Sequence, residues 1–589
     1  MTVKISLEMS KNISQPEQLI TEHIDIWTSA ILAKSTSGRG SSKKYELYGI
    51  TKLRELILEL AVRGKLVPQD NNDEPASVLL EKIGSEKAQL IKDKKIKKPK
   101  KLAEVSDDEH YFSTPQGWHW SRLNDIGEWG AGATPSRSNS KYYGGGIPWF
   151  KSGELSEDYI SESQETITES ALKETSLREN KPGDVLLAMY GATIGKASIL
   201  EIAGTTNQAV CACTPFSGIT NTFLLMLLKA YRARFIGMGA GGAQPNISRE
   251  KIIATVIALP PTAEQKRIVA KVDELMLLCD QLEQQTEASI EAHATLVEVL
   301  LATLTDSVDA DELAQNWARI SEHFDSLFTT EQSIEALKQT VLQLAVMGKL
   351  VPQDPNDEPA SVLVRDIMNT KSKDIEEGKV KKSKKLEEVN EESLFDLPVG
   401  WVWEQMGNLG DTNTGLTYSP HDVDTIGTPV LRSSNIQKGK IDLSDLVRVN
   451  KQVKESSLVH ESDLLICARN GSKALVGKTA QIINLSEPMA FGAFMTIFRS
   501  NINNYIEVFL NSPIFRARLE GVATTTINQI TQSNLRNTMC PLPPLAEQLR
   551  IVAKVDELMT ICDQLKEKLQ QSQETQIQLT DALVDRALG

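Results

Sequence analysis

One segment occurs twice in this chain, and it constrains the fold more than any other feature. Leu259 to Leu282 reads LPPTAEQKRIVAKVDELMLLCDQL and Leu542 to Leu565 reads LPPLAEQLRIVAKVDELMTICDQL, so 20 of the 24 positions are identical. In both copies two prolines end the preceding element, and an acidic residue, Glu264 or Glu547, lies in the first turn that follows. Each copy therefore predicts a helix that begins after its prolines.

The apolar residues of both copies follow alternating steps of four and three, which is the spacing of a heptad seam. Such a seam has to be buried against another helix, and the chain contains two matching ones, so we predict that they pack on each other. A helix of about 40 residues from Glu264 would be ~60 Å long, enough to hold two globular bodies apart. We expect the seam to weaken after Leu282 and to recover at Leu296 and Leu300. An ordinary amphipathic helix pair is the alternative. The predicted spacer seam consists of Ile268, Val272, Leu275, Cys279, Leu282, Ile551, Val555, Leu558, Cys562 and Leu565.

A second repeated block precedes each of these segments. Leu60 to Leu79 and Leu344 to Leu363 share LAVxGKLVPQDxNDEPASVL, with 18 of 20 positions identical. Each block follows an amphipathic helical pattern, and Gly64 or Gly348 is a typical residue for ending that helix. Two long repeats in the same order indicate that the chain is duplicated.

Shorter matches extend the duplication over nearly the whole chain. ITEHID from Ile20 corresponds to ISEHFD from Ile320, and a polar insertion at 34–48 lengthens only the first copy. Lysine-rich runs follow the repeated blocks, at Ile91 to Leu102 and at Lys379 to Leu386. We interpret these runs as solvated connectors, with contact to phosphates as the alternative.

Two dissimilar segments lie between the repeats. Each begins with a Pro-x-Gly-Trp-x-Trp signature, at Pro115 and at Pro398. Its two tryptophans are predicted to lie on one strand face and to anchor a domain core. Short strand-like runs follow, and fragments of the two segments can be paired although most of their residues differ. We predict a shared framework that carries different side chains.

The net charge of −14 is unevenly distributed. Glu264 to Ser326 holds 14 acidic and four basic residues, whereas 115–258 has 13 of each and 398–541 has 13 basic and 12 acidic residues. Neither insert is strongly basic, so a DNA-binding role requires local basic strips or a partner protein. The N-terminus has no signal-peptide pattern and no apolar run approaches a membrane span, which predicts a cytoplasmic protein.

No catalytic or metal-binding pattern stands out, so we expect no catalytic residues and no metal site. Six scattered cysteines lack a CxxC spacing, and seven histidines show no ligand spacing. GATIGKA from Gly191 leaves three residues between its glycines and GSKALVGK from Gly471 leaves five, whereas a phosphate-binding loop needs four. We therefore interpret both as turns. The Asn/Asp-Pro-Pro-aromatic corner of an adenine methyltransferase is absent.

Polar side chains at turns beside the paired fragments are candidates for DNA contact, because they can form hydrogen bonds to base edges or phosphates. Those in the first insert are Lys151, Ser152, Tyr190, Thr193, Lys196, Asn207 and Gln208. Those in the second insert are Arg432, Ser433, Asn435, Arg469, Asn470, Lys473 and Lys478. The alternative is that many of them are surface residues that only satisfy turns.

The near-identical frames predict two equivalent docking surfaces. The two unlike inserts predict two different recognition surfaces. A pseudo-twofold arrangement would bind two copies of one partner, and the inserts would read two halves of an asymmetric ligand. Bipartite duplex DNA fits this description because it offers separated half-sites. A coiled-coil scaffold that binds two proteins without reading DNA is the alternative, and a nucleotide-dependent enzyme is a remote second one.

The LPPxxEQxxIVxxVDEL segments, the GKLVPQD and DEPAS blocks and the two variable inserts closely resemble the specificity subunit of type I restriction-modification enzymes, particularly the longer type IB branch. This resemblance implies two target recognition domains that each read one half of a split DNA sequence, and an antiparallel helical spacer. It also implies docking of two adenine methyltransferase subunits and two ATP-dependent translocase-nuclease subunits. The chain itself would be non-catalytic, and S-adenosylmethionine, ATP and magnesium would be bound by the partners.

The expected fold is mixed α and β, with two α/β recognition domains separated by an antiparallel coiled coil of two long helices and related by internal pseudo-twofold symmetry. The expected divisions are an N-terminal helical extension (1–50), a first repeated frame (51–114), a first target recognition domain (115–260), a central long helix (261–310), a second repeated frame (311–397), a second target recognition domain (398–543) and a C-terminal long helix (544–589).

Overall fold

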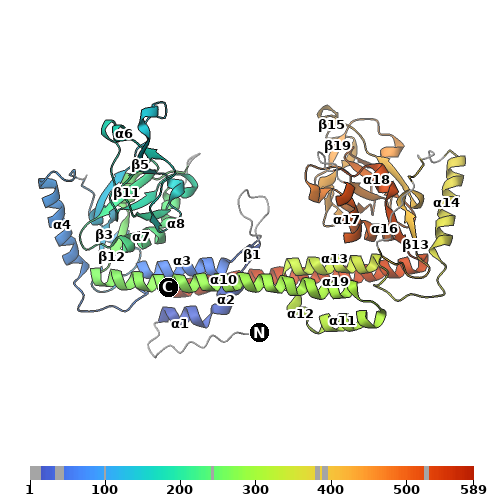
Figure 1. Ribbon diagram of the computed structural model, residues 1–589, viewed down its shortest axis with the longest axis horizontal. Coiled ribbons are helices and arrows are strands. Elements are labelled where there is room, and N and C mark those ends of the chain that lie inside the picture. Colours follow the sequence, from blue (N-terminus) through green and yellow to red (C-terminus); the bar gives the residue numbers. More distant parts are fainter. Residues whose placement is uncertain are drawn as a thin grey trace. The chain divides into compact units, whose positions relative to one another are not determined.

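The computed structural model describes residues 15–33, 45–98, 101–239, 245–378, 385–387, 395–522 and 529–589. The chain forms two compact units, of which unit 1 combines residues 1–288 with 572–589 and unit 2 comprises 289–571. Two long helices are shared between them (Figure 1), α10 (Thr262–Asp306, 45 residues) and α19 (Leu545–Leu588, 44 residues). The long helices predicted after the Leu-Pro-Pro sequences are therefore present.

The helical frame of unit 1 contains α1 (Gln15–Glu22), α2 (Ile24–Ser29), α3 (Tyr48–Val62) and α4 (Ala76–Lys92), besides parts of α10 and α19. Helix α3 is amphipathic and buries Leu53, Leu56, Ile57 and Leu60. It ends just before Gly64, whose φ of +67° belongs to the left-handed region and whose added Cβ would lie 2.5 Å from Pro115. The predicted glycine stop is confirmed, because only glycine combines this conformation with such close packing.

The β-domain of unit 1 is built on a five-stranded sheet in the order β4-β11-β8-β9-β6 and a three-stranded sheet β10-β5-β7, with a separate pair β12-β3. Its strands are β3 (His119–Arg122), β4 (Gly127–Ala131), β5 (Tyr143–Phe150), β6 (Tyr159–Ile160), β7 (Thr166–Ile167), β8 (Val185–Ala188), β9 (Ala197–Leu200), β10 (Thr205–Thr206), β11 (Val210–Pro215) and β12 (Val256–Leu259), and β1 (Leu32–Ala33) pairs with β2 (Tyr45–Glu46) outside it. Its helices are α5 (Leu123–Ile126), α6 (Glu169–Glu174), α7 (Asn221–Ala230), α8 (Arg232–Gly239) and α9 (Arg249–Ala254).

Unit 2 repeats this plan with two four-stranded sheets, β14-β23-β20-β21 and β15-β19-β16-β22, and with the pairs β13-β24 and β17-β18. Its strands are β13 (Val402–Gln405), β14 (Asp411–Thr414), β15 (Val423–Asp424), β16 (Thr428–Leu431), β17 (Ile436–Gln437), β18 (Lys440–Ile441), β19 (Val447–Val449), β20 (Leu464–Cys467), β21 (Thr479–Gln481), β22 (Ala490–Phe491), β23 (Met495–Arg499) and β24 (Met539–Leu542). Its helices are α11 (Ala310–Glu322), α12 (Phe324–Leu327), α13 (Glu331–Val346), α14 (Ala360–Glu376), α15 (Met406–Leu409), α16 (Asn503–Asn511), α17 (Pro513–Val522) and α18 (Gln532–Asn537).

A buried carboxylate in the first turn of a long helix binds the first tryptophan of the β-domain segment in each unit. Trp118 Nε1 donates to Glu264 at 3.0 Å, and Trp401 Nε1 donates to Glu547 at 2.9 Å. Both carboxylates are about 1 % exposed, and burial raises their pKa. Because a buried polar group needs a partner, the tryptophan is held by its indole N–H as well as by packing.

This contact corrects the prediction for the Trp-x-Trp signature. Trp118 lies in the turn before β3 and not on the strand, since its backbone N–H donates to Pro115 O at 3.2 Å. The second tryptophan, Trp120, lies on β3 and stacks on His110 at 4.9 Å between ring centroids. The two rings therefore have different roles, one in joining the turn to the long helix and one in an aromatic cluster.

The ten residues predicted for the spacer seam are buried or half-buried, and the first five are at most 5 % exposed. Beyond Leu282 the prediction is wrong for Leu296, whereas Leu300 is half-buried and packs against the core of unit 2. Leu296 is 51 % exposed, whereas Val297, Leu301 and Leu304 are buried. A straight helix turns by about 20° per heptad relative to a 3.5-residue repeat, so its buried stripe drifts to the neighbouring residue.

Helix α10 is also the one helix, among the described residues, that is long and apolar enough to cross a membrane. Some of its apolar residues pack within the protein. Val297, Leu301 and Leu304 belong to the hydrophobic core of unit 2, together with residues of α13 and of the first part of α19. Only 17 % of the apolar window of α10 is buried, and Leu277, Leu296 and Val299 are more than half exposed, so this packing accounts for part of its composition.

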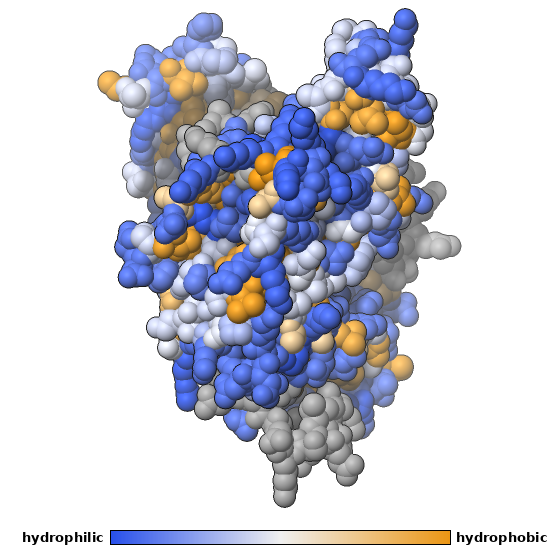
Figure 2. Space-filling model, turned by 90° about the vertical axis from the view of Figure 1, so that its left-hand side faces the viewer, coloured by the Kyte–Doolittle hydropathy of each residue, from blue (hydrophilic) through white to orange (hydrophobic). Residues whose placement is uncertain are grey.

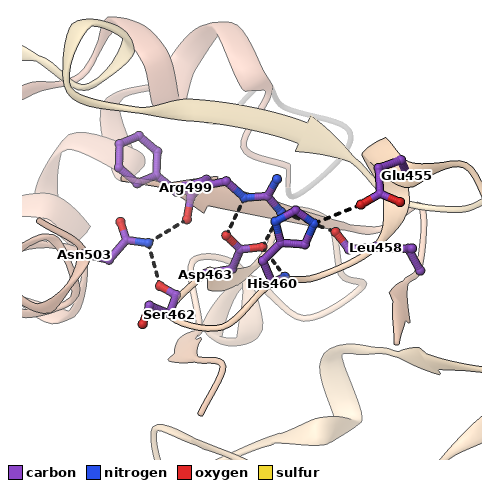
Figure 3. A network of polar contacts seen from close by, with 8 residues as sticks. Glu455, Leu458, His460, Ser462, Asp463, Arg499 and Asn503 are labelled. Atoms are coloured by element: carbon purple, nitrogen blue, oxygen red, sulfur yellow. Dashed lines mark hydrogen bonds and ion pairs between the residues drawn. The ribbon is translucent and has the colours of Figure 1, made fainter. Parts of the chain in front are cut away.

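A buried carboxylate also organises the β-domain of unit 2 (Figure 3). Asp463 is 1 % exposed and receives two hydrogen bonds from Arg499, at 2.7 and 2.6 Å, and one from the backbone N–H of His460 at 2.8 Å. Next to it, Asn503 Nδ2 donates to the carbonyl oxygens of Ser462 at 2.7 Å and Phe498 at 3.1 Å. These contacts tie the loop before β20 to β23 and α16.

Candidate nucleic-acid interface

Three turns meet at one edge of the β-domain in unit 1. Strands β5 and β10 are parallel, with Phe150 opposite Thr206, so Lys151 and Asn207 follow their strands side by side. The backbone N–H of Asn207 donates to Phe150 O at 3.0 Å. The third turn, between β8 and β9, is brought to the same edge by β11.

Strand β11 is the link because Val210 lies opposite Ala188 of β8. The next pair of residues continues the ladder, since Met189 N donates to Ala209 O at 2.8 Å. Tyr190 and Gln208 come next and are both exposed. All seven candidates of the first insert therefore lie in the three turns that converge on this edge, and Gly191–Thr193 forms a 3-10 turn instead of a phosphate loop.

Unit 2 builds the same edge with the same hydrogen bonds. Leu431 of β16 lies opposite Phe491 of β22 in parallel pairing, and Gly492 N donates to Leu431 O at 2.9 Å. Cys467 of β20 lies opposite Met495 of β23, and Ala468 N donates to Phe494 O at 3.0 Å. The registers make Arg469 the counterpart of Tyr190 and Phe494 the counterpart of Ala209.

The side chains at the two edges differ in kind. In unit 1 Tyr190 is 42 % exposed and Ala209 is 7 % exposed, whereas in unit 2 Phe494 is 61 % exposed. The guanidinium of Arg469 lies 5.4 Å from the centroid of the Phe494 ring. A cation over an aromatic face is attracted by the ring quadrupole, and the pair forms one projecting group.

Two cations share one carboxylate at the edge of unit 1. Lys151 forms an ion pair with Glu165, and Arg137 contacts the same carboxylate at 2.6 Å. The hydrogen bonds from Arg137 and then Lys151 lower the pKa of Glu165. Since one negative charge faces two positive ones, the cluster keeps a net positive charge, and the Arg137 side chain is 56 % exposed.

Several candidates of the second insert serve the domain's own structure. Asn435 is 1 % exposed, and its amide accepts from Arg432 N and donates to the carbonyl oxygens of Asp442 and Asp445. This is contrary to the expectation of a DNA contact, because the amide closes a turn inside the domain. Lys478 donates to Ile436 O at 2.6 Å.

Several of the remaining candidates form hydrogen bonds or ion pairs within their own domain. Arg432 pairs with Asp445 at 2.9 Å, and Asn470 donates to Ser433 at 3.2 Å. In unit 1 Thr193 donates to Tyr190 O at 2.7 Å, and the side chain of Asn207 accepts from Ala209 N at 3.1 Å. Ser152 is half-buried in a 3-10 turn after β5, Lys196 is half-buried, and Lys473 is exposed.

Four residues of these edges were not predicted from the sequence, namely Arg137, Phe494, Asn246 and Gln529. Asn246 bridges to Tyr190 and Gln529 bridges to Arg469, and both amides belong to exposed residues. A signal for the amides exists in the sequence. Asn-Ile-Ser and Gln-Ile-Thr occupy matching places just before α9 and α18. Phe494 has no such signal, because its counterpart is an alanine.

Among the described residues no group of three or more His, Cys, Asp and Glu side chains could hold a metal ion. All six cysteines are buried and free. The chemistry that these edges offer consists of hydrogen-bond donors and acceptors, cations and one exposed aromatic ring, which are the groups that contact base edges and phosphates.

The chain is similar to several known proteins. The model of the type I restriction modification DNA specificity domain matches residues 115–292 and 398–574. The chain is 40 % identical over 596 aligned positions to the type I restriction enzyme EcoAI specificity subunit of Escherichia coli, covering 97 % of this chain and 100 % of that protein. It is 41 % identical to the EcoEI specificity subunit of Escherichia coli, with the same coverage. The crystal structure of the HsdS subunit from Thermoanaerobacter tengcongensis aligns with 82 % of this chain and 98 % of its own, at 19 % identity and a TM-score of 0.39.

Proposed function

Because the chain belongs to the family of type I restriction enzyme specificity subunits, we propose that its two β-domains each read one half of a bipartite, asymmetric DNA sequence. The observation that supports this proposal is the repeated edge. One backbone framework positions three turns in each unit, and the residues that project from it are dissimilar. Similar scaffolds that carry different side chains are suited to reading two different base sequences on the same kind of DNA backbone.

The side chains that are most exposed at each edge are the proposed readers. In the first domain they are Tyr190, Gln208 and Asn246, supported by the cations Lys151, Lys196 and Arg137. In the second domain they are Arg469, Phe494 and Gln529, with Lys473 in the same turn as Arg469. Arg432, Ser433, Asn470, Thr193, Ser152 and Asn207 are proposed to shape the turns, and Asn435 and Lys478 to hold them from inside.

The repeated frames are proposed to dock two methyltransferase subunits in the same way, and two translocase-nuclease subunits complete the complex. In support of this, both units repeat the ion pair of the PQDxNDEPAS loop with the long helix. Arg267 contacts Asp73 at 2.6 Å and Arg550 contacts Asp357 at 2.6 Å. Because the two loops have nearly the same sequence and are fixed by the same ion pair, each unit presents the same surface to a partner.

We further propose that α10 and α19 pack as an antiparallel coiled coil, with internal pseudo-twofold symmetry, whose length sets the gap between the half-sites. The seven divisions of the chain expected from the sequence are kept in this proposal. The chain is a non-catalytic, cytoplasmic component, and its partners bind S-adenosylmethionine, ATP and magnesium. Sites of recognition and of chemistry are thereby on different chains.

Binding to a library of duplexes tests this function. The chain is co-purified with its methyltransferase partner, and the bound duplexes are sequenced. We expect two short conserved blocks separated by a gap of fixed length, and tighter binding to them than to random duplexes by about 10³-fold or more at physiological salt. A complex that forms normally and binds all duplexes equally would support a scaffold without DNA recognition instead.

The projecting pair Arg469 and Phe494 gives a test at the level of single residues. Replacing Arg469 by alanine is expected to relax the preference at one or two positions of the second block by about 1–3 kcal/mol, while the first block is unchanged. Phe494→Ala is expected to act on a position next to them, because an exposed ring contacts a thymine methyl group or a base face. Arg448→Gln is the matched control, since Arg448 lies near the opposite end of β16 and pairs with Glu487. An unchanged preference in the Arg469 variant would contradict the assignment.

A further inference from the structure

Five exposed lysines gather where α4 ends, and we call them the lysine tip: Lys92, Lys94, Lys95, Lys97 and Lys98. The one acidic residue among them is Asp93, which accepts a hydrogen bond from Gln89 at 2.8 Å. Within the part of the chain that the structure describes, no carboxylate pairs with any of the five ammonium groups. The tip is therefore a concentrated positive charge on a chain whose net charge is −14.

The backbone conformation at one residue of the lysine tip is energetically unfavourable for lysine. Lys94 has a φ of +57°, in the left-handed region that favours glycine. Its counterpart after the matching helix α14 is Gly378, with a φ of +75° and the same backbone hydrogen bond to the residue three positions earlier. A lysine in the place where the second copy has glycine suggests that its charge contributes to function.

The pattern of lysines is also retained by the duplication. Residues 95–102 read KIKKPKKL and residues 379–386 read KVKKSKKL, so five lysines keep their register although the intervening residues change. Three of them, Lys95, Lys97 and Lys98, belong to the lysine tip, whereas Lys92 and Lys94 correspond to Glu376 and Gly378. Most of the second run lies outside the described residues, and only its sequence is compared. A feature that is common to both copies fits a ligand that both halves share. The bases of two half-sites differ, but their phosphate backbone is the same.

The composition of the tip favours phosphates over a protein partner. Protein interfaces are depleted in lysine and are centred on buried aromatic or apolar anchors. The apolar side chains at the tip are Ile91 and Ile96, and both are already half-buried. Figure 2 views the molecule from the side on which α4 lies, and this surface is largely hydrophilic with small, separate hydrophobic patches. Lysine on a flexible stem is well suited to phosphates as a mobile point charge.

We infer that the lysine tip is a sequence-independent contact to the DNA phosphate backbone, separate from the turns that read bases. This inference rests on the proposed DNA-binding function and adds a second site to it. Helix α4 carries the tip on an arm of 17 residues, alongside the β-domain of unit 1 (Figure 1). The contact contributes affinity to any sequence and leaves the preference among sequences unchanged.

The dependence of DNA binding on salt tests the inference. In the full chain with its methyltransferase partner, the five lysines are replaced together by glutamine. The slope of log K against log salt concentration is expected to become shallower by roughly 0.9 for each phosphate that is no longer neutralised, and thus by about 2–4 in total. Affinity at about 0.1 M salt is expected to fall at least tenfold for cognate and random duplexes alike. Replacing the same five lysines by arginine keeps the positive charges. This variant is expected to keep the wild-type salt slope and the wild-type affinity.

Two outcomes separate the possible failures. If the glutamine variant keeps the wild-type slope and affinity, the lysine tip is only a solvated connector and the inference is overturned. If the wild-type complex itself prefers no sequence, the proposed function has failed, independently of the tip. Lys94→Gly controls for folding, since glycine relieves the left-handed strain. The midpoint temperature of thermal unfolding of the Lys94→Gly variant is expected to rise. Its slope of log K against log salt concentration is expected to become shallower by about one.

Discussion

Exchanging the first β-domain for that of a relative with a different target is expected to change one half of the recognised DNA sequence and to leave the other half intact. The physical reason is the way in which the domain is closed. Strands β3 and β12 pair antiparallel, with Trp120 opposite Ala258, so the segment enters and leaves the frame through two adjacent strands. A domain with neighbouring ends can be replaced without moving the frame.

The best boundaries lie inside that strand pair, at residues 123–255, because the exchange then keeps β3, β12 and the contact between Trp118 and Glu264. Specific sites are bound about 10³–10⁷ times more tightly than random DNA, so the new half-site should replace the old one completely in a duplex selection. The matched control is the exchange of 406–538, which lies between β13 and β24 and should alter only the other half. A change in both halves after either exchange would show that the two domains do not read independently.

Replacing Arg499 by methionine is expected to destabilise the β-domain of unit 2 by about 3–5 kcal/mol, because it leaves the buried Asp463 carboxylate without its charged partner. Two hydrogen bonds are removed at once, and one backbone N–H, that of His460, remains. The measurement is the free energy of unfolding by urea, monitored in the full chain. Cognate binding is expected to fail at the second half-site first.

A second substitution separates the unpaired charge from lost packing. Adding Asp463→Leu to Arg499→Met removes the stranded carboxylate, and most of the lost stability should return. In unit 1 the matching carboxylate, Asp184, accepts a backbone hydrogen bond from Lys181 N at 3.0 Å. Thr214, which occupies the place of Arg499 there, gives a matched control, and Thr214→Val should cost much less. Equal losses at Thr214 and Arg499 would argue against the charge explanation.

Local signals in the sequence predicted most of the repeated frame. The Leu-Pro-Pro sequences precede the long helices, and Gly64 and Gly348 follow α3 and α13 with φ of +67° and +71°. These outcomes depend on backbone preferences of a few adjacent residues, and such preferences are visible in the chain itself. The drift of the buried stripe to Val297 depends on accumulated helical rotation, which a repeat of 3.5 residues does not describe.

The candidate site was predicted less well. Polar residues at turns were found, because Gly and Asn mark turns, but Asn435 proved to be buried and Phe494 was overlooked. Whether a polar side chain closes its own turn or projects from it depends on carbonyl oxygens contributed by other loops, here those of Asp442 and Asp445. An exposed aromatic ring is equally unpredictable, since aromatic residues are usually buried.

The sequence by itself determined that this protein has two copies of one frame, two long helices and two dissimilar domains of one plan, because repeats and helix signals are written in neighbouring residues. Only the tertiary structure decided that turns far apart in sequence, such as those at Lys151, Tyr190 and Asn207, meet at one edge. Strand register brings them together. Register is set by hydrogen bonds between distant segments, which no local pattern specifies.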